Sequence, residues 1–250
     1  MKTGDSVSGL LFGSIKQMRA IKKVAVIAGT PVDTKMGVDY LNNRNDEITE
    51  GGVRIEPHCC PASEDCDEQY RFQYTDDDGK QAVMDNIFDP EIADGVRDFF
   101  IYCNSLSGSF DFDSYAMKKS IETGEDIHIY TPLQVYRKMG KDYSCVGVMA
   151  ANNISAHGIE EAMMAASPGI YVIGTGNMSI VRAIEDGRSP EEIVKECGLR
   201  DMAAYMQACG AEAIILGCTH FPYIRDELAK ITELPLVDPA DQMFEAMIGQ

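Results

Sequence analysis

The sequence predicts an α/β protein built from two similar doubly wound domains with parallel sheets. Short apolar runs rich in β-branched residues alternate with helical stretches along most of the 250 residues, and this alternation is typical of parallel sheets flanked by helices. The runs are apolar at nearly every position, as expected for strands buried on both faces. Two units of about 100 residues each account for this length more simply than a single sheet of eight or more strands.

The apolar runs define the predicted strands, and the helical stretches between them have recognisable ends. Ser189 followed by Pro190 predicts a helix start, and Gly187 and Gly198 predict helix ends. The predicted strands are Val24–Gly29, Phe99–Tyr102, Ile127–Tyr130, Cys145–Ala150, Ile170–Gly174, Ala213–Gly217 and Leu234–Val237, and the predicted helices are Ser114–Glu122, Pro132–Met139, Ile159–Ala166, Ser179–Glu185 and Glu191–Glu196.

The segment Gly108–Asp113 offers a boundary between the two units, because it lies between a strand and a helix and contains turn-forming residues. We expect a first domain over residues 18–110, completed by a C-terminal segment 219–250 whose strand returns to the first sheet. The second domain is then 111–218. Residues 1–17 show no clear apolar period and are treated as an extension outside the fold.

Composition and charge exclude several classes of protein. The chain has 40 Asp and Glu against 22 Lys and Arg, a formal net charge of −18. General nucleic-acid binding and binding to anionic membranes both begin with clustered cations, so neither partner is predicted. No apolar run reaches the roughly 18 residues of a membrane span. Eight cysteines in 250 residues are too few for a disulfide scaffold, which indicates reduced thiols and a cytoplasmic protein.

Much of the excess negative charge falls in residues 45–98, which contain 16 acidic and four basic residues. We expect a solvated, loop-rich insertion around Tyr74–Lys80. Its consecutive aspartates lack the alternating spacing of calcium loops. Four residues of this region are possible metal ligands with nitrogen or sulfur donors: His58, Cys59, Cys60 and Cys66. Their spacing matches none of the common zinc motifs, so no metal site is predicted.

Two predicted strands end in cysteine followed by small polar or imidazole side chains. Cys103 follows Phe99–Tyr102, and Cys218 follows Ala213–Gly217. Ligands bind at the carboxyl ends of strands in open α/β sheets, and a helix N-terminus or a nearby imidazolium lowers the pKa of a thiol. If the two halves face each other, the two thiols can remove a proton from one face of a carbon and return it to the opposite face.

The segments Cys103-Asn104-Ser105 and Gly217–Pro222 (GCTHFP) resemble the paired cysteine motifs of the cofactor-independent aspartate/glutamate racemase family. The loop from Thr30 to Thr34 occupies the place of that family's Asp-Ser-Gly loop, so the resemblance extends over residues 22–248. It implies an active-site cleft with one cysteine from each domain and an amino-acid substrate, glutamate or aspartate. It also implies that no cofactor is needed, and it is compatible with a homodimer.

The resemblance implies roles for individual residues. Cys103 and Cys218 would be the two bases, while Asp33 and His220 would adjust the protonation of the nearer thiol. The substrate carboxylates would be held by four residues that offer side-chain and main-chain donors: Thr34, Asn104, Ser105 and Thr219.

Other functions are compatible with the same residues. A related enzyme would racemise or isomerise a different carbon acid, for example a hydantoin. A non-catalytic amino-acid-binding protein would keep the cleft without needing two opposed thiols. A dithiol redox protein would join Cys103 and Cys218 in a disulfide.

Overall fold

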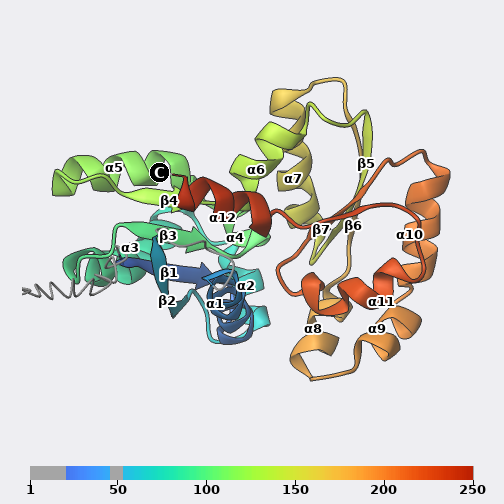
Figure 1. Cartoon of the computed structure of the whole chain (residues 1–250), viewed down its shortest axis with the longest axis horizontal. Coiled ribbons are helices and arrows are strands. Elements are labelled where there is room, and N and C mark those ends of the chain that lie inside the picture. The colour runs from blue at the N-terminus through green and yellow to red at the C-terminus, as the bar shows by residue number, and fades with distance from the viewer. Residues whose placement is uncertain (1–20, 46–52, 250) are drawn as a thin grey trace, which may run out of the picture.

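The computed structural model describes residues 21–45 and 53–249, and it contains two four-stranded parallel sheets with helices on their faces (Figure 1). The strand orders are β2-β1-β3-β4 and β6-β5-β7-β8. The predicted two-sheet α/β class is therefore confirmed. The strands are β1 (Ile21–Ala28), β2 (Arg54–Pro61), β3 (Asp98–Ile101), β4 (His128–Tyr130), β5 (Cys145–Ala150), β6 (Tyr171–Gly176), β7 (Ile214–Gly217) and β8 (Leu236–Val237).

The central strands are the most apolar, because helices cover both of their faces. In β1 the run Val24–Ala28 is fully buried, and β3 and β7 are buried along their whole length. The helices are α1 (Pro31–Asn45), α2 (Cys66–Phe72), α3 (Asp77–Ala93), α4 (Asn104–Ser109), α5 (Phe112–Thr123), α6 (Pro132–Met139), α7 (Asn153–Ala166), α8 (Met178–Glu185), α9 (Pro190–Glu196), α10 (Leu199–Ala208), α11 (Arg225–Ala229) and α12 (Ala240–Ile248), with a 3₁₀ turn, η1, at Phe221–Ile224.

All seven predicted strands are present, but two of them pair differently from the expectation. The strand β8 pairs with β7 in the second sheet, so the predicted return of this strand to the first sheet is wrong. The strand β4 pairs with β3 in the first sheet, although the boundary at residue 110 assigned it to the second domain. The strand β2 was missed because Pro57, His58 and the adjacent cysteines interrupt its apolar pattern.

The acidic region is not the loop-rich insertion that its composition suggested. Its described part, residues 53–98, contains β2, α2 and α3, and two of its aspartates cap helices. The Asp65 side chain accepts hydrogen bonds from the backbone N–H groups of Asp67 and Glu68, and Asp76 accepts one from Gly79 at 2.9 Å. Carboxylates stabilise helix N-termini in this position. The predicted extension at residues 1–17 lies outside the described residues.

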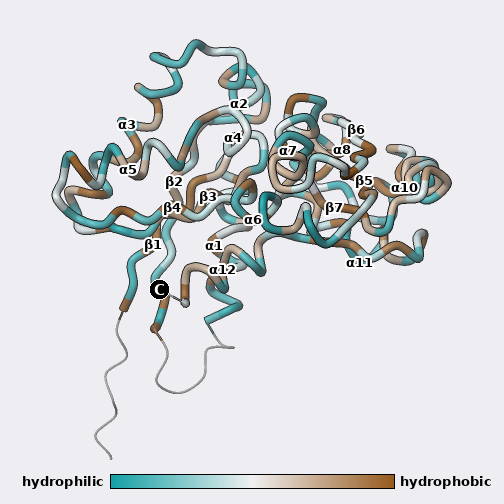
Figure 2. The backbone as a smooth tube through the Cα atoms, turned by 90° about the horizontal axis from the view of Figure 1, so that it is seen from above, coloured by the Kyte–Doolittle hydropathy of each residue, from teal (hydrophilic) through white to brown (hydrophobic). Residues whose placement is uncertain are grey.

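Two helices cross closely between the sheets. A β-carbon on Gly158 of α7 would lie 3.3 Å from the Cα of Gly108 in α4, so the small size of both residues allows the helices to approach. After β8 the chain crosses back, and α12 packs against α6 and β4 of the first half (Figure 1). Seen from above, the two halves lie side by side (Figure 2). None of the described helices has the length and apolarity needed to cross a membrane.

A core aromatic cluster provides a test of the packing. Phe88 of α3 is fully buried, with its ring stacked on Phe99 at a centroid distance of 4.2 Å and edge-on to Tyr115 at 5.0 Å. We expect Phe88→Ala to lower the free energy of unfolding by about 3–5 kcal/mol, because it removes apolar contacts and leaves a cavity. Urea unfolding measures this change. Tyr171→Ala, at a side chain that is 75% exposed, is the control and should change stability little.

Candidate active site

A small pocket lies where the carboxyl ends of strands from both sheets meet. Its walls come from the loops after β1, β3, β5 and β7 and from helices α2 and α8, which is the usual place for ligands in α/β folds. The free volume is about 20 Å³, roughly the room needed for one water molecule. The lining residues include both predicted cysteines, Cys103 and Cys218, together with Thr30, Asp33, Cys66, Gln69, Asn104, Ser105, Thr219 and His220.

On one side of the pocket, a histidine lies beside Cys218. The His220 Nδ1 atom is 3.7 Å from the Cys218 sulfur, and its Nε2 atom is 3.2 Å from Glu185 Oε1. Burial opposes a charged imidazole, but the contacts with Cys218, Glu185 and Asp33 outweigh burial and raise the pKa of His220 to about 11. The imidazole is therefore cationic at neutral pH.

Asp33 lies at the N-terminal end of α1 and joins the two halves of the site. Its carboxylate accepts hydrogen bonds from the backbone N–H of Gly29 at 3.2 Å and of Thr30 at 2.6 Å. The Thr219 hydroxyl donates to it at 3.4 Å from the other sheet. Burial raises the pKa of Asp33, while the His220 imidazolium and the N–H donors oppose that shift.

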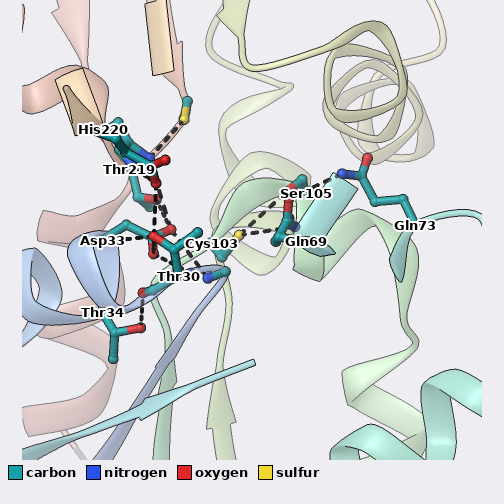
Figure 3. A network of polar contacts seen from close by, with 12 residues as sticks. Thr30, Asp33, Thr34, Gln69, Gln73, Cys103, Ser105, Thr219 and His220 are labelled. Atoms are coloured by element: carbon teal, nitrogen blue, oxygen red, sulfur yellow. Dashed lines mark hydrogen bonds and ion pairs between the residues drawn. The ribbon is translucent and has the colours of Figure 1, made fainter. Parts of the chain in front are cut away.

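On the other side of the pocket, the Cys103 thiol lies among neutral polar groups. The Ser105 hydroxyl is 3.3 Å from the sulfur, and the Gln69 amide nitrogen is 3.9 Å from it and 2.6 Å from the Ser105 hydroxyl (Figure 3). Burial and the Asp33 carboxylate raise the pKa of Cys103 to about 12, despite the lowering effect of the Ser105 hydroxyl. Cys103 is thus a protonated thiol at neutral pH.

Of the four residues predicted to hold carboxylates, three line the pocket and one does not. Asn104 accepts a hydrogen bond from the Tyr136 hydroxyl at 2.6 Å, and its amide nitrogen is buried without a hydrogen-bond partner. Ser105 and Thr219 also line the pocket. The Thr34 side chain is fully buried and its hydroxyl donates to the Thr30 carbonyl at 2.5 Å, so the structure does not bring it to the site.

Several residues that line the pocket or contact its lining were not predicted as site residues from the sequence. Glu185 ends α8 and accepts hydrogen bonds from His220 and from the Thr30 hydroxyl, at 3.0 Å for the latter. Cys66 and Gln69 come from α2, and the Gln69 side chain packs so closely on Gly29 that a β-carbon there would lie 2.6 Å from Gln69 Cγ. None of these residues follows an apolar strand directly, so no strand-end pattern identifies them.

Two further polar contacts join the two halves of the protein across the pocket. Arg182 of α8 donates a hydrogen bond to Asp67 of α2 at 2.5 Å, and Thr30 donates to Glu185. Burial and the Glu185 carboxylate raise the pKa of the nearby Cys66 thiol to about 11. The pocket is therefore closed by polar contacts between α2 and the loop after β1 on one side and α8 on the other.

Residues 129–247 match the family model described as Asp/Glu/Hydantoin racemase. The matched segment begins in β4, ends in α12 and contains Cys218. Among curated proteins, the chain is 27% identical over 165 residues to a glutamate racemase of Acidothermus cellulolyticus, an alignment that covers 62% of this chain and 58% of that protein. It is 32% identical over 87 residues to a glutamate racemase of Herpetosiphon aurantiacus, covering 34% of each chain. The alignments thus span less than two thirds of the length of these relatives.

Solved structures of this racemase group share the fold. A glutamate racemase from Francisella tularensis, solved with D-glutamate, superposes with a TM-score of 0.65 at 19% identity and covers 91% of this chain and 80% of that one. An aspartate racemase from Picrophilus torridus gives a TM-score of 0.60 at 17% identity, covering 91% and 93%. The two-sheet arrangement predicted from the sequence is common to all of them.

The contacts of the His220 imidazole predict the pH range over which it stays protonated. We expect the imidazole to stay protonated from pH 6 to pH 9, because Glu185 and Asp33 stabilise the cation and hold its pKa near 11. Glu185→Gln removes one of these carboxylates and should lower that pKa. NMR of ¹⁵N-labelled histidine measures both values, with Glu212→Gln, far from the pocket, as the control. A wild-type midpoint below pH 7 would contradict this view of the site.

Proposed function

We propose that this protein is an isomerase that racemises an acidic amino acid, glutamate or aspartate, by cofactor-independent proton transfer at Cα. The observation that carries this proposal is the placement of Cys103 and Cys218, which end strands of different sheets and line one pocket. Two acid–base groups on opposite walls can serve the two faces of one carbon. The racemase family match of residues 129–247 supports the same reaction class.

In the proposed cycle, one thiol must be a base while the other is an acid. Cys103 is the protonated partner, so the thiolate role falls to Cys218, which has the His220 cation beside it. The Cys218 thiolate takes the Cα proton and becomes a thiol, and the electron pair moves into the α-carboxylate. Cys103 then gives its proton to the opposite face of Cα and becomes a thiolate. No atom is gained or lost, and the two sulfurs exchange states.

The other pocket residues fit supporting roles in this proposal. Asp33 and His220 set the protonation of the nearer thiol, and Glu185 keeps His220 cationic. The unpartnered amide nitrogen of Asn104 and the hydroxyls of Ser105 and Thr219 are donors for the substrate carboxylates. Donors aimed at the α-carboxylate stabilise the charge that develops there when the proton leaves.

The same two-base reaction could act on a second class of substrate. The matching family model also includes hydantoin racemases, so a hydantoin is the second substrate class that we consider. Cys103 and Cys218 are free thiols, as the two-base chemistry requires, and a reducing compartment such as the cytoplasm would preserve them.

The first test measures hydrogen exchange at Cα. In D₂O the reduced protein should replace the Cα hydrogen of L- and D-glutamate or of L- and D-aspartate, as seen by loss of the ¹H NMR signal with parallel loss of optical rotation. A panel with 5-substituted hydantoins separates the two substrate classes. If the folded, reduced protein exchanges none of these carbon acids, the racemase proposal is wrong.

The second test removes each base separately. Cys103→Ser and Cys218→Ser should each lower racemisation by roughly 10²–10⁴-fold, because general acid–base catalysis contributes about that much. Circular dichroism checks that both variants fold. Cys209→Ser, at an exposed cysteine outside the pocket, is the matched control and should keep full activity. Full racemisation by either pocket variant would contradict the two-base assignment.

A further inference from the structure

A second group of chemically reactive side chains lies in the first half of the protein, outside the pocket. His58 and Cys60 belong to the edge strand β2, and Glu91 belongs to the last turns of α3. Three possible ligand atoms, one from each residue, lie within 4.8 Å of one another: His58 Nε2, Cys60 Sγ and a Glu91 carboxylate oxygen. An imidazole, a thiol and a carboxylate therefore converge on one point from two elements.

The spacing along the strand explains why these side chains converge. Residues two apart on a strand point to the same face, so His58 and Cys60 share a face while Cys59 points away from it and is exposed. Cys66, which the sequence grouped with them, lines the pocket instead. The third ligand, Glu91, is distant in sequence, and no local ligand motif could have shown it.

One of the two contacts within this cluster already has the spacing of ligands in a tetrahedral metal site, and the other is shorter. The Cys60 sulfur is 3.3 Å from Glu91 Oε1, and His58 Nε2 is 2.6 Å from Glu91 Oε2. Zinc bonds of about 2.0–2.3 Å to nitrogen, oxygen and sulfur place neighbouring ligand atoms roughly 3.3–3.8 Å apart. The side chains of His58 and Glu91 are 40% and 23% exposed, which leaves them room to rotate toward that spacing.

We propose that His58, Cys60 and Glu91 bind one zinc ion, with water as the fourth ligand. Thiolate, imidazole and carboxylate together suit Zn²⁺, whereas Mg²⁺ and Ca²⁺ prefer sites built only of oxygen. Binding releases the proton of the Cys60 thiol to solvent as the sulfur joins the metal. The ion cross-links the edge strand β2 to α3. The chain continues from β2 directly into α2, which supplies Cys66 and Gln69 to the pocket.

The test uses the full chain, reduced and freed of metal by a chelator. Cobalt(II) is the probe, because a bond between cobalt and a thiolate gives an intense near-ultraviolet absorption band. We expect one equivalent of cobalt to produce this band and one equivalent of zinc to abolish it. Cys60→Ser should remove the band, and Glu91→Gln and His58→Asn should each weaken binding at least about tenfold, the low end for losing a metal-supporting residue.

Two matched controls come from the same strand. Cys59→Ser and Glu56→Gln change an exposed thiol and an exposed carboxylate beside the cluster, and both should bind cobalt like the wild type. A band that survives Cys60→Ser and disappears in Cys218→Ser would place the metal in the pocket and overturn the proposal. Failure of the wild-type protein to bind cobalt or zinc at micromolar concentrations would also overturn it.

A measurement on the unmodified protein guards against variants that fail to fold. Zinc should slow alkylation of Cys60 by iodoacetamide at least about tenfold, measured by mass spectrometry of the peptides. Alkylation of the exposed Cys209 should proceed at its metal-free rate and serves as the internal control. Equal rates at Cys60 with and without zinc would show that its sulfur is not a ligand.

Discussion

Three ionisable side chains meet between the carboxyl ends of the two sheets: the buried Asp33 and His220 and the partly buried Glu185. Separately each would be costly to bury as an ion, but together the imidazolium is flanked by two carboxylates that accept further hydrogen bonds from Gly29, Thr30 and Thr219. Because the donors come from both halves of the chain, the network requires the strand ends of β1 and β7 to face each other. The same requirement brings the two cysteines into one pocket.

The network also gives the two thiols different charged neighbours. Cys218 has a cation beside it, whereas Cys103 has hydroxyl and amide groups and the Asp33 carboxylate nearby. The different neighbours of the two strand ends therefore distinguish the two thiols in the proposed proton transfer.

Strand-end residues were the part of the site that could be predicted from the sequence. Cys103, Asn104, Ser105, Cys218, Thr219 and His220 directly follow apolar strands, and parallel strands bring their carboxyl ends to one edge. Glu185 and Gln69 could not be predicted in this way, because helices α8 and α2 position them through packing between distant segments. The fold was limited in the same way. The strand β2 has too few apolar residues to be recognised, and the sheet that β8 joins is decided by contacts between distant segments, which pair it with β7.

The small volume of the pocket has a consequence for ligand affinity. Its roughly 20 Å³ holds about one water molecule, and any amino acid is several times larger. The contacts between Thr30 and Glu185 and between Arg182 and Asp67 join the two halves beside this space, which has to widen before an amino acid fits. When only a fraction of molecules is open, the apparent dissociation constant is the intrinsic one divided by that fraction. A measured affinity for this protein therefore reports its opening equilibrium together with the contacts made to the ligand.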